Sequence, residues 1–187
     1  IENGRAITAL GYANRLYTIL VGVFSFVATN LLFPYFSRAA ASGDLAASRR
    51  LMVVSARVLS YIIAPIAAGV AVLAEPVSAL IYERGEFTAA DTAMTAEALR
   101  FYAAGMLFMA VGEVLTKAFF AEGRPKIPMW TSIAATAANF ALVAWLSHYG
   151  IGGIALASGA ATALQCVLNA AVMRRIAQEP VPRAALL

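Results

Sequence analysis

The stretch LYTILVGVFSFVATNLLFPYF, residues 16–36, decides the fold, because it is dominated by apolar side chains and contains no charge. A helix needs roughly 20 predominantly apolar residues to cross the hydrocarbon core of a bilayer. The whole chain has 187 residues, of which 61% are hydrophobic and 13% are charged. A soluble surface needs more polar side chains than this, so the composition indicates an integral membrane protein.

Four further stretches have the same apolar character, and the pattern of the first extends back towards residue 6. Open sheet edges cannot face lipid, so we expect an all-α fold. About five membrane-spanning helices are predicted within a single membrane domain over residues 1–187, at residues 6–36, 51–74, 98–121, 128–149 and 151–173. The chain starts at Ile1 without a basic leader, which indicates an internal segment of a longer protein rather than a signal peptide.

The connections between the predicted spans alternate in charge. The loop at 37–50, the connector at 122–127 and the tail at 174–187 hold several arginines and lysines, whereas the connection at 75–88 holds more acids than bases. By the positive-inside rule, the two basic loops and the tail face the cytoplasm. The net charge of +4 is small, and the basic residues do not form one face, so nucleic acid is not an expected partner.

Two local features carry structural predictions. Thr88 is a natural helix N-cap, with Asp91 three residues later in the capping-box position. The single cysteine, Cys166, lies in an apolar run and is expected to be a small buried residue.

Arg15 is the charged residue that most needs an explanation. If the first span starts near residue 6, Arg15 lies about 14 Å along the helix axis. A lone arginine at that depth costs about 2.5–3.5 kcal/mol and should face protein or a water-filled cavity. The alternative is that the embedded part begins only at Leu16, which leaves Arg15 as an interfacial anchor whose side chain reaches the membrane surface.

Glu113 and Lys117 stand one helical turn apart in the predicted third span. One interpretation is a self-neutralising pair near the cytoplasmic end of that span. The other makes Glu113 a carboxylate of an internal cavity. The chain contains no motif for nucleophilic, metal-hydrolytic or nucleotide chemistry, so an enzyme is not expected.

A series of short motifs then resembles one family in order along the chain. They are GYANRL at 11–16, LFPYFSR at 32–38, ERGEFT at 83–88, EVLTKAF at 113–119 and GIGGIALA at 150–157. In this register the chain resembles the MurJ (MviN) lipid II flippase family, within the multidrug, oligosaccharidyl-lipid and polysaccharide exporter superfamily. The resemblance implies most of the second six-helix lobe of a fourteen-helix transporter, with spans resembling helices 8 to 12.

The resemblance also implies a function and a site. The family moves lipid II, a diphosphate-linked peptidoglycan precursor, from the cytoplasmic to the periplasmic leaflet of the bacterial plasma (inner) membrane. The resemblance matches Arg15 to the family's cavity arginine, and we add Asn14 and Glu113 as secondary candidates for substrate binding. Fixed guanidinium groups can replace the water around a diphosphate with charge-assisted hydrogen bonds. Implied partners are lipid II, membrane lipids and the missing first lobe of the same protein.

No cofactor or resident metal is expected. Some members of the family bind sodium through an asparagine and a carboxylate one turn later; Asn139 matches the asparagine, but Val143 stands at the second position. Coupling to the membrane potential or to a monovalent cation stays open. Two other functions also stay open: a related polysaccharide-lipid or drug exporter, and a non-transporting membrane scaffold for surface assembly.

Overall fold

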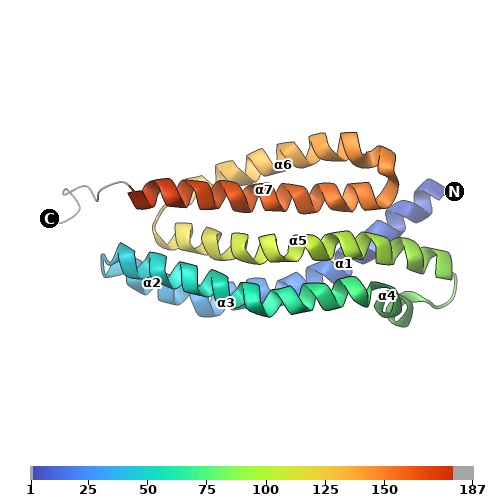
Figure 1. Ribbon diagram of the computed structural model, residues 1–187, viewed down its shortest axis with the longest axis horizontal. Helices are drawn as coiled ribbons and strands as arrows, with labels where there is room; N and C mark the ends of the chain where they lie inside the picture. The colour runs from blue at the N-terminus through green and yellow to red at the C-terminus, as the bar shows by residue number, and fades with distance from the viewer. Residues whose placement is uncertain (1, 179–187) are drawn as a thin grey trace.

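The structure is a computed structural model that describes residues 2–178, and this part of the chain is helical apart from short turns. It forms a bundle of long helices that run roughly along one axis (Figure 1). The elements, in chain order, are α1 (Glu2–Val27), a π-helical turn (Ala28–Leu32), α2 (Phe33–Ala41), α3 (Leu45–Val72), α4 (Ala74–Tyr82), α5 (Ala89–Ala121), α6 (Lys126–Leu146), a 3-10 turn (Ser147–Tyr149) and α7 (Gly150–Gln178).

The first predicted span is a single helical rod that continues through α2. The helix widens where Phe33 donates its backbone N–H to the carbonyl of Ala28. Pro34 follows directly, and its ring nitrogen has no hydrogen to donate to the preceding turn. A local π-helical turn accommodates this lost donor without ending the helix. The span predicted to end at residue 36 therefore continues to Ala41.

The basic loop predicted at 37–50 is much shorter than expected. Only residues 42–44 separate α2 from α3. Asp44 caps α3 by accepting a hydrogen bond from the backbone N–H of Ala47 at 2.8 Å, which fixes the start of the helix. The tail predicted at 174–187 begins inside α7, and its residues after 178 lie outside the described residues.

The sequence analysis missed α4. The segment 75–88 was predicted as a connection, yet its first part is the helix Ala74–Tyr82. Glu75 in the first turn suits a helix N-terminus, and Pro76 is tolerated there because the first helical N–H groups have no partner within the helix. The arginine of the following loop, Arg84, donates to the carbonyls of Ile81 at 2.7 Å and Leu80 at 3.4 Å, which satisfies the end of α4.

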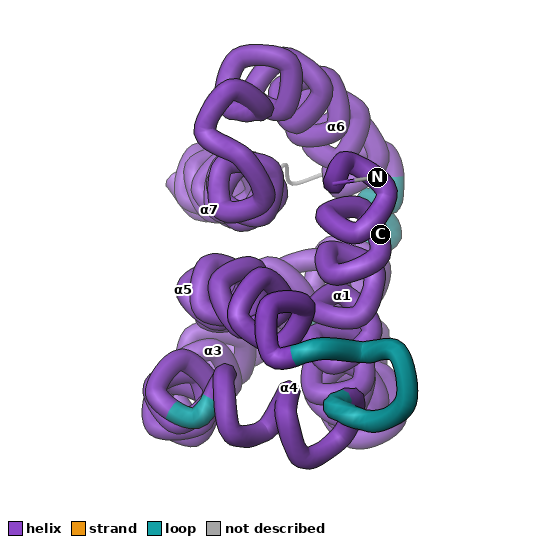
Figure 2. The backbone as a smooth tube through the Cα atoms, turned by 90° about the vertical axis from the view of Figure 1, so that its right-hand side faces the viewer, coloured by secondary structure: helices purple, strands orange, loops and turns teal. Residues whose placement is uncertain are grey.

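The helix α5 is the centre of the bundle. It begins at Ala89, where Asp91 accepts hydrogen bonds from the backbone N–H of Thr88 at 2.9 Å and from its hydroxyl at 2.7 Å, so the predicted capping box is confirmed. Viewed end-on, α5 lies between the α6–α7 pair and the α3 and α4 helices, with α1 beside it (Figure 2). Most of its buried residues are apolar, among them Leu99, Met106, Val114 and Phe119.

The helices α6 and α7 fold back on each other as a hairpin (Figure 1). Gly150 has a φ of 75° at the turn, a conformation that glycine adopts without steric cost. Four continuous helical segments are long and apolar enough to span a membrane, namely Ile7–Ala41, Ala46–Val72, Ala89–Ala121 and Lys126–Ile176. The last of these contains both arms of the hairpin.

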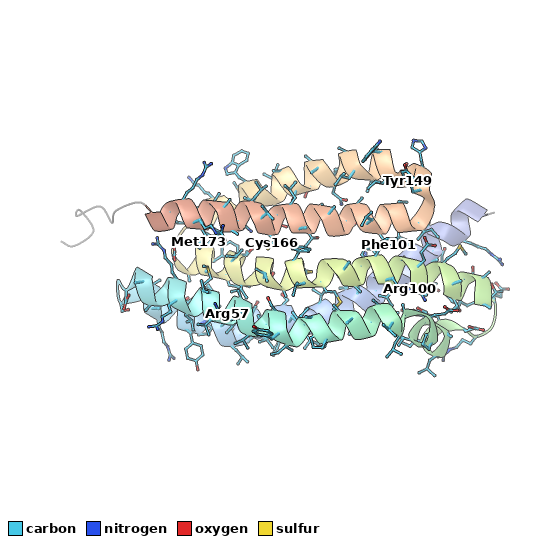
Figure 3. All side chains as sticks on the ribbon, in the orientation of Figure 1. Arg57, Arg100, Phe101, Tyr149, Cys166 and Met173 are labelled. Carbon is cyan, nitrogen blue, oxygen red and sulfur yellow. The ribbon has the colours of Figure 1, made fainter. Side chains whose placement is uncertain are left out.

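The packing of α7 on α5 relies on small and sulfur-containing residues. Phe101 lies between the two helices (Figure 3), and a Cβ added at Gly152 would lie 2.6 Å from its ring. Cys166 is a buried free thiol in the cluster with Val114 and Phe119, as the sequence predicted.

The connections sort by charge between the two ends of the bundle. The α2–α3 and α5–α6 turns lie at the same end as the C-terminal end of α7, and the α4–α5 loop and α6–α7 turn lie at the other (Figure 1). The first end carries Arg49, Arg50, Arg124 and Lys126, whereas the second carries Glu75, Glu83 and Glu86 with Arg84. The alternation of basic and acidic connections along the sequence therefore places like loops together in space.

Candidate functional site

Arg15 lies on α1, eight residues into the candidate span Ile7–Ala41, or about 12 Å along its axis. The side chain is exposed in this chain, and its guanidinium carbon stands 5.7 Å from the centre of the Tyr12 ring. Within the part of the chain that the structure describes, no carboxylate forms an ion pair with Arg15. A guanidinium held against an aromatic face with no acidic partner is placed to receive an anion.

A large open pocket, called the outer pocket below, is lined in part by Tyr12, the residue whose ring Arg15 faces. Its volume is about 790 Å³ and it lies at the end of the bundle that carries the acidic α4–α5 loop. Helices α1, α4 and α5 and that loop all contribute to it. Its lining residues include Arg5, Thr8, Tyr12, Tyr82, Arg84, Glu86, Phe87 and Asp91.

Three aromatic rings form one wall of the outer pocket. The centroids of Tyr12 and Tyr82 are 4.6 Å apart, and Phe87 lies 5.4 Å from Tyr12 and 5.8 Å from Tyr82. Burial raises the pKa of Tyr82, while the positive charge of Arg15 opposes that rise. The Tyr82 hydroxyl therefore stays neutral at physiological pH, and Arg15 lies close enough to influence the wall.

Asn14 lies on a different side of α1 from Arg15, because consecutive helical residues point about 100° apart. Asn14 lines a smaller hollow of about 190 Å³ between α1, α5 and α7, together with Tyr17, Tyr102, Ser158 and Thr162. Its side-chain oxygen accepts a hydrogen bond from the Thr18 hydroxyl at 3.3 Å. The structure thus separates two neighbouring residues of the predicted site.

Glu113 lines a second small hollow, of about 150 Å³, that shares Thr162 with the first. We call these two hollows together the inner cleft. The carboxylate of Glu113 lies 3.4 Å from the Lys117 ammonium and accepts a hydrogen bond from the Ser25 hydroxyl at 3.0 Å. The ion pair predicted within this helix is present and lies beside the inner cleft, and a substrate-binding role for Glu113 stays a prediction.

Asn139 lies on α6 with its side-chain oxygen buried and without a hydrogen-bond partner, and Val143 follows one turn later. Nearby on the hairpin, the amide oxygen of the fully buried Asn169 accepts from the Thr131 hydroxyl at 2.7 Å. Among the described residues no group of three or more His, Cys, Asp or Glu side chains could hold a metal ion. A role for Asn139 in cation binding stays a prediction.

Sequence reasoning missed the aromatic wall, because Tyr82 belongs to the helix α4 that was predicted as a connection. A signal was present in the sequence: Tyr82 and Phe87 flank the charged run of residues 83–86, which is an unusual place for large rings unless they pack on each other or on a ligand.

The outside of the bundle is apolar. Large hydrophobic side chains are exposed along α1, α3 and α6, among them Ile19, Phe26, Val58, Tyr61 and Phe140. Such a surface suits lipid. Many of the ionisable groups lie at the bundle ends, in the inner cleft or around the outer pocket, and Arg57 is an exposed charge within α3. These features define a multi-pass, all-helical membrane protein with polar hollows between its helices.

Comparison with known proteins identifies the family of the chain. The sequence profile of the family described as lipid II flippase MurJ matches residues 2–185. The chain belongs to this family, whose members are multi-pass proteins of the bacterial inner membrane.

Individual relatives agree with that assignment. A probable lipid II flippase MurJ of Rickettsia prowazekii is 31% identical over 150 residues, which cover 78% of this chain and 30% of the relative. One from Vibrio cholerae is 28% identical and covers 91% of this chain and 32% of the relative. The chain therefore spans about a third of the length of the curated relatives it matches.

A solved structure shares the fold. Lipid II flippase MurJ in an inward closed conformation superposes with a TM-score of 0.81 at 22% identity, over 90% of this chain and 36% of that one.

Proposed function

We propose that this chain forms most of the second lobe of a flippase that moves lipid II from the cytoplasmic to the periplasmic leaflet. The first lobe would come from the rest of the protein, and rocking of the two lobes would expose the site to each side in turn. Support comes from membership of the family, from the names of the relatives and from the fold.

The observation that carries the proposal is Arg15. It lies inside a candidate membrane span, exposed and without a carboxylate partner among the described residues, and it faces the ring of Tyr12, which lines the outer pocket. A lone cation within a membrane-spanning helix is costly, so its presence there needs water or an anionic ligand. A diphosphate supplies the charge and the geometry that a guanidinium binds with paired hydrogen bonds.

The test uses the full-length protein in cells depleted of their own lipid II flippase. The wild-type protein should restore growth and lipid II translocation, whereas Arg15→Ala at equal expression should not. Arg15→Lys keeps the charge but loses the planar fork, so it should rescue partly. Failure of the wild-type protein to complement would favour an exporter of another lipid or a scaffold, and full activity of Arg15→Ala would remove Arg15 from the mechanism.

A further inference from the structure

The outer pocket has chemistry that a diphosphate alone does not use. It brings together three aromatic rings, two guanidinium groups and two carboxylates. The guanidiniums are those of Arg5 and Arg84, and the carboxylates are those of Glu86 and Asp91. Because the charges balance, the pocket as a whole has no excess of positive charge to attract a bare phosphate.

The same groups match a saccharide. Sugar hydroxyl and amide groups both donate and accept hydrogen bonds, so they can use guanidinium donors and carboxylate acceptors within one pocket. The C–H face of a sugar ring is weakly positive and stacks on the electron-rich face of an aromatic ring. A volume of about 790 Å³ lies within the roughly 300–1,000 Å³ of typical ligand pockets.

The wall is fixed before any ligand arrives. Tyr82 donates its hydroxyl to the backbone carbonyl of Tyr12 at 3.5 Å, which ties α4 to α1. Arg84 is held on the end of α4, and Asp91 is held by Thr88 at the start of α5. Each anchored group therefore loses little conformational entropy when a ligand binds, and this smaller cost favours binding.

Arg15 connects the outer pocket to the proposed function. Its guanidinium lies against the Tyr12 ring, and Tyr12 is also part of the pocket wall. A diphosphate held by Arg15 would therefore place a directly attached saccharide over Tyr12, Tyr82 and Phe87. The two groups of one ligand would occupy adjoining places, the phosphates inside and the sugars towards the mouth.

We propose that the outer pocket is a saccharide-binding subsite, which holds the sugars of a polyprenyl-diphosphate-linked substrate on the outer side of Arg15. This inference rests on the proposed function and adds to it the part of the substrate that each group recognises. Arg15 binds the diphosphate, and the aromatic wall contacts the sugars, so that it distinguishes lipids with attached sugars from lipids without them.

The test compares two lipids on the purified full-length protein: a polyprenyl diphosphate that carries a disaccharide without peptide, and the same polyprenyl diphosphate without sugar. Tyr82→Leu removes one ring from the wall. It should weaken binding of the disaccharide lipid roughly three- to tenfold, the loss expected for one aromatic stacking contact. Binding of the sugar-free lipid should stay within about twofold of wild type, which is less than one hydrogen bond contributes.

Tyr61→Leu is the matched control, because Tyr61 is 75% exposed on α3, away from the pocket lining. It should leave both affinities unchanged. Phe87→Leu, in the α4–α5 loop, repeats the test at a position outside the helices, should Tyr82→Leu prevent folding. Equal losses for the two lipids, or no loss with either pocket variant, would overturn the saccharide subsite.

The same measurement separates the two proposals. If the wild-type protein binds both lipids and Arg15→Ala loses both, while the ring variants bind both normally, only the saccharide subsite falls. If the wild-type protein binds neither lipid, the proposed function falls and the subsite falls with it.

Discussion

The inner cleft and the outer pocket lie on the same helices, α1 and α5, but they differ in how their charges are satisfied. In the inner cleft, Glu113 is paired with the Lys117 ammonium on its own helix and accepts a hydrogen bond from the Ser25 hydroxyl. Beside the outer pocket, Arg15 lies over the Tyr12 ring and, within residues 2–178, forms no ion pair with a carboxylate. An ion pair within one helix stabilises the fold, whereas a cation without a carboxylate partner is available to an anionic ligand. We therefore predict a structural role for the ion pair of the inner cleft and a binding role for Arg15 beside the outer pocket.

Substitutions of the two neighbouring residues Arg15 and Asn14 on α1 should therefore differ strongly in their effect on transport, and this is the largest difference that we expect. Arg15→Ala should lower lipid II translocation by about 100-fold, because it removes charge-assisted hydrogen bonds worth about 3 kcal/mol. Asn14→Ala should lower it by less than about fivefold, because its hydrogen bond to Thr18 is between neutral groups at an exposed position. Initial translocation rates in vesicles at equal protein content measure both, and equal effects would contradict the separation of the two faces.

The helix contact beneath the inner cleft should govern stability. A Cβ added at Gly105 would lie 3.2 Å from the Cα of Gly159, and backbone cannot move aside easily. Gly105→Ala should lower the free energy of unfolding by about 1–3 kcal/mol, as overpacking does in tight cores. Gly69→Ala on α3 meets nothing within 4 Å and is the control, with equal or higher stability expected. Thermal unfolding in detergent measures both; an unchanged midpoint for Gly105→Ala would argue against close α5–α7 packing.

The ion pair of the inner cleft should behave as a structural unit. Lys117→Met leaves the partly buried Glu113 without its cation and should lower stability by about 1–2 kcal/mol, less than for a fully buried pair. Combining it with Glu113→Gln should recover most of that loss. A double-mutant cycle on the unfolding midpoint gives the coupling. Additive effects would show that the interaction between Glu113 and Lys117 contributes nothing to stability. The ion pair would then not explain why the inner cleft differs from the site of Arg15.

The smallest expected effect concerns the wall of the outer pocket. Asp91→Ala removes the acceptor for both Thr88 hydrogen bonds and should lower stability by about 1 kcal/mol, the usual cost of a lost cap. Hydrogen exchange should increase in the first turn of α5 and in the 83–88 loop, and should not change in α6. Exchange that is unchanged in this loop would indicate that the capping box does not fix the pocket wall.

Much of the fold follows from apolar length and local chemistry. The run at 16–36, the capping box at Thr88 and the burial of Cys166 are each decided by nearby residues. The extent of the first helix was underestimated, because a π-helical turn absorbs Pro34 and lets the helix continue to Ala41. That accommodation depends on packing around the helix and leaves no mark in hydropathy.

The candidate site was harder to predict. Arg15 was singled out by its cost in a membrane helix, and its role stays a prediction that transport assays must test. The aromatic wall depends on α4, a nine-residue helix that is too short for a hydropathy signal of a span. Long-range contacts such as that between Tyr12 and Tyr82 become visible only once the helices are packed.

The central claim is that Arg15 faces a water-filled route rather than lipid or packed protein. Its most direct test is Arg15→Cys in a cysteine-free full-length protein, treated in intact cells or spheroplasts with a hydrophilic, membrane-impermeant thiol reagent. We predict that position 15 reacts, whereas a cysteine in place of Tyr61, which is 75% exposed on the apolar surface of α3, does not react. Absence of labelling at position 15, in a protein that is folded and inserted in the membrane at the wild-type level, would contradict the account.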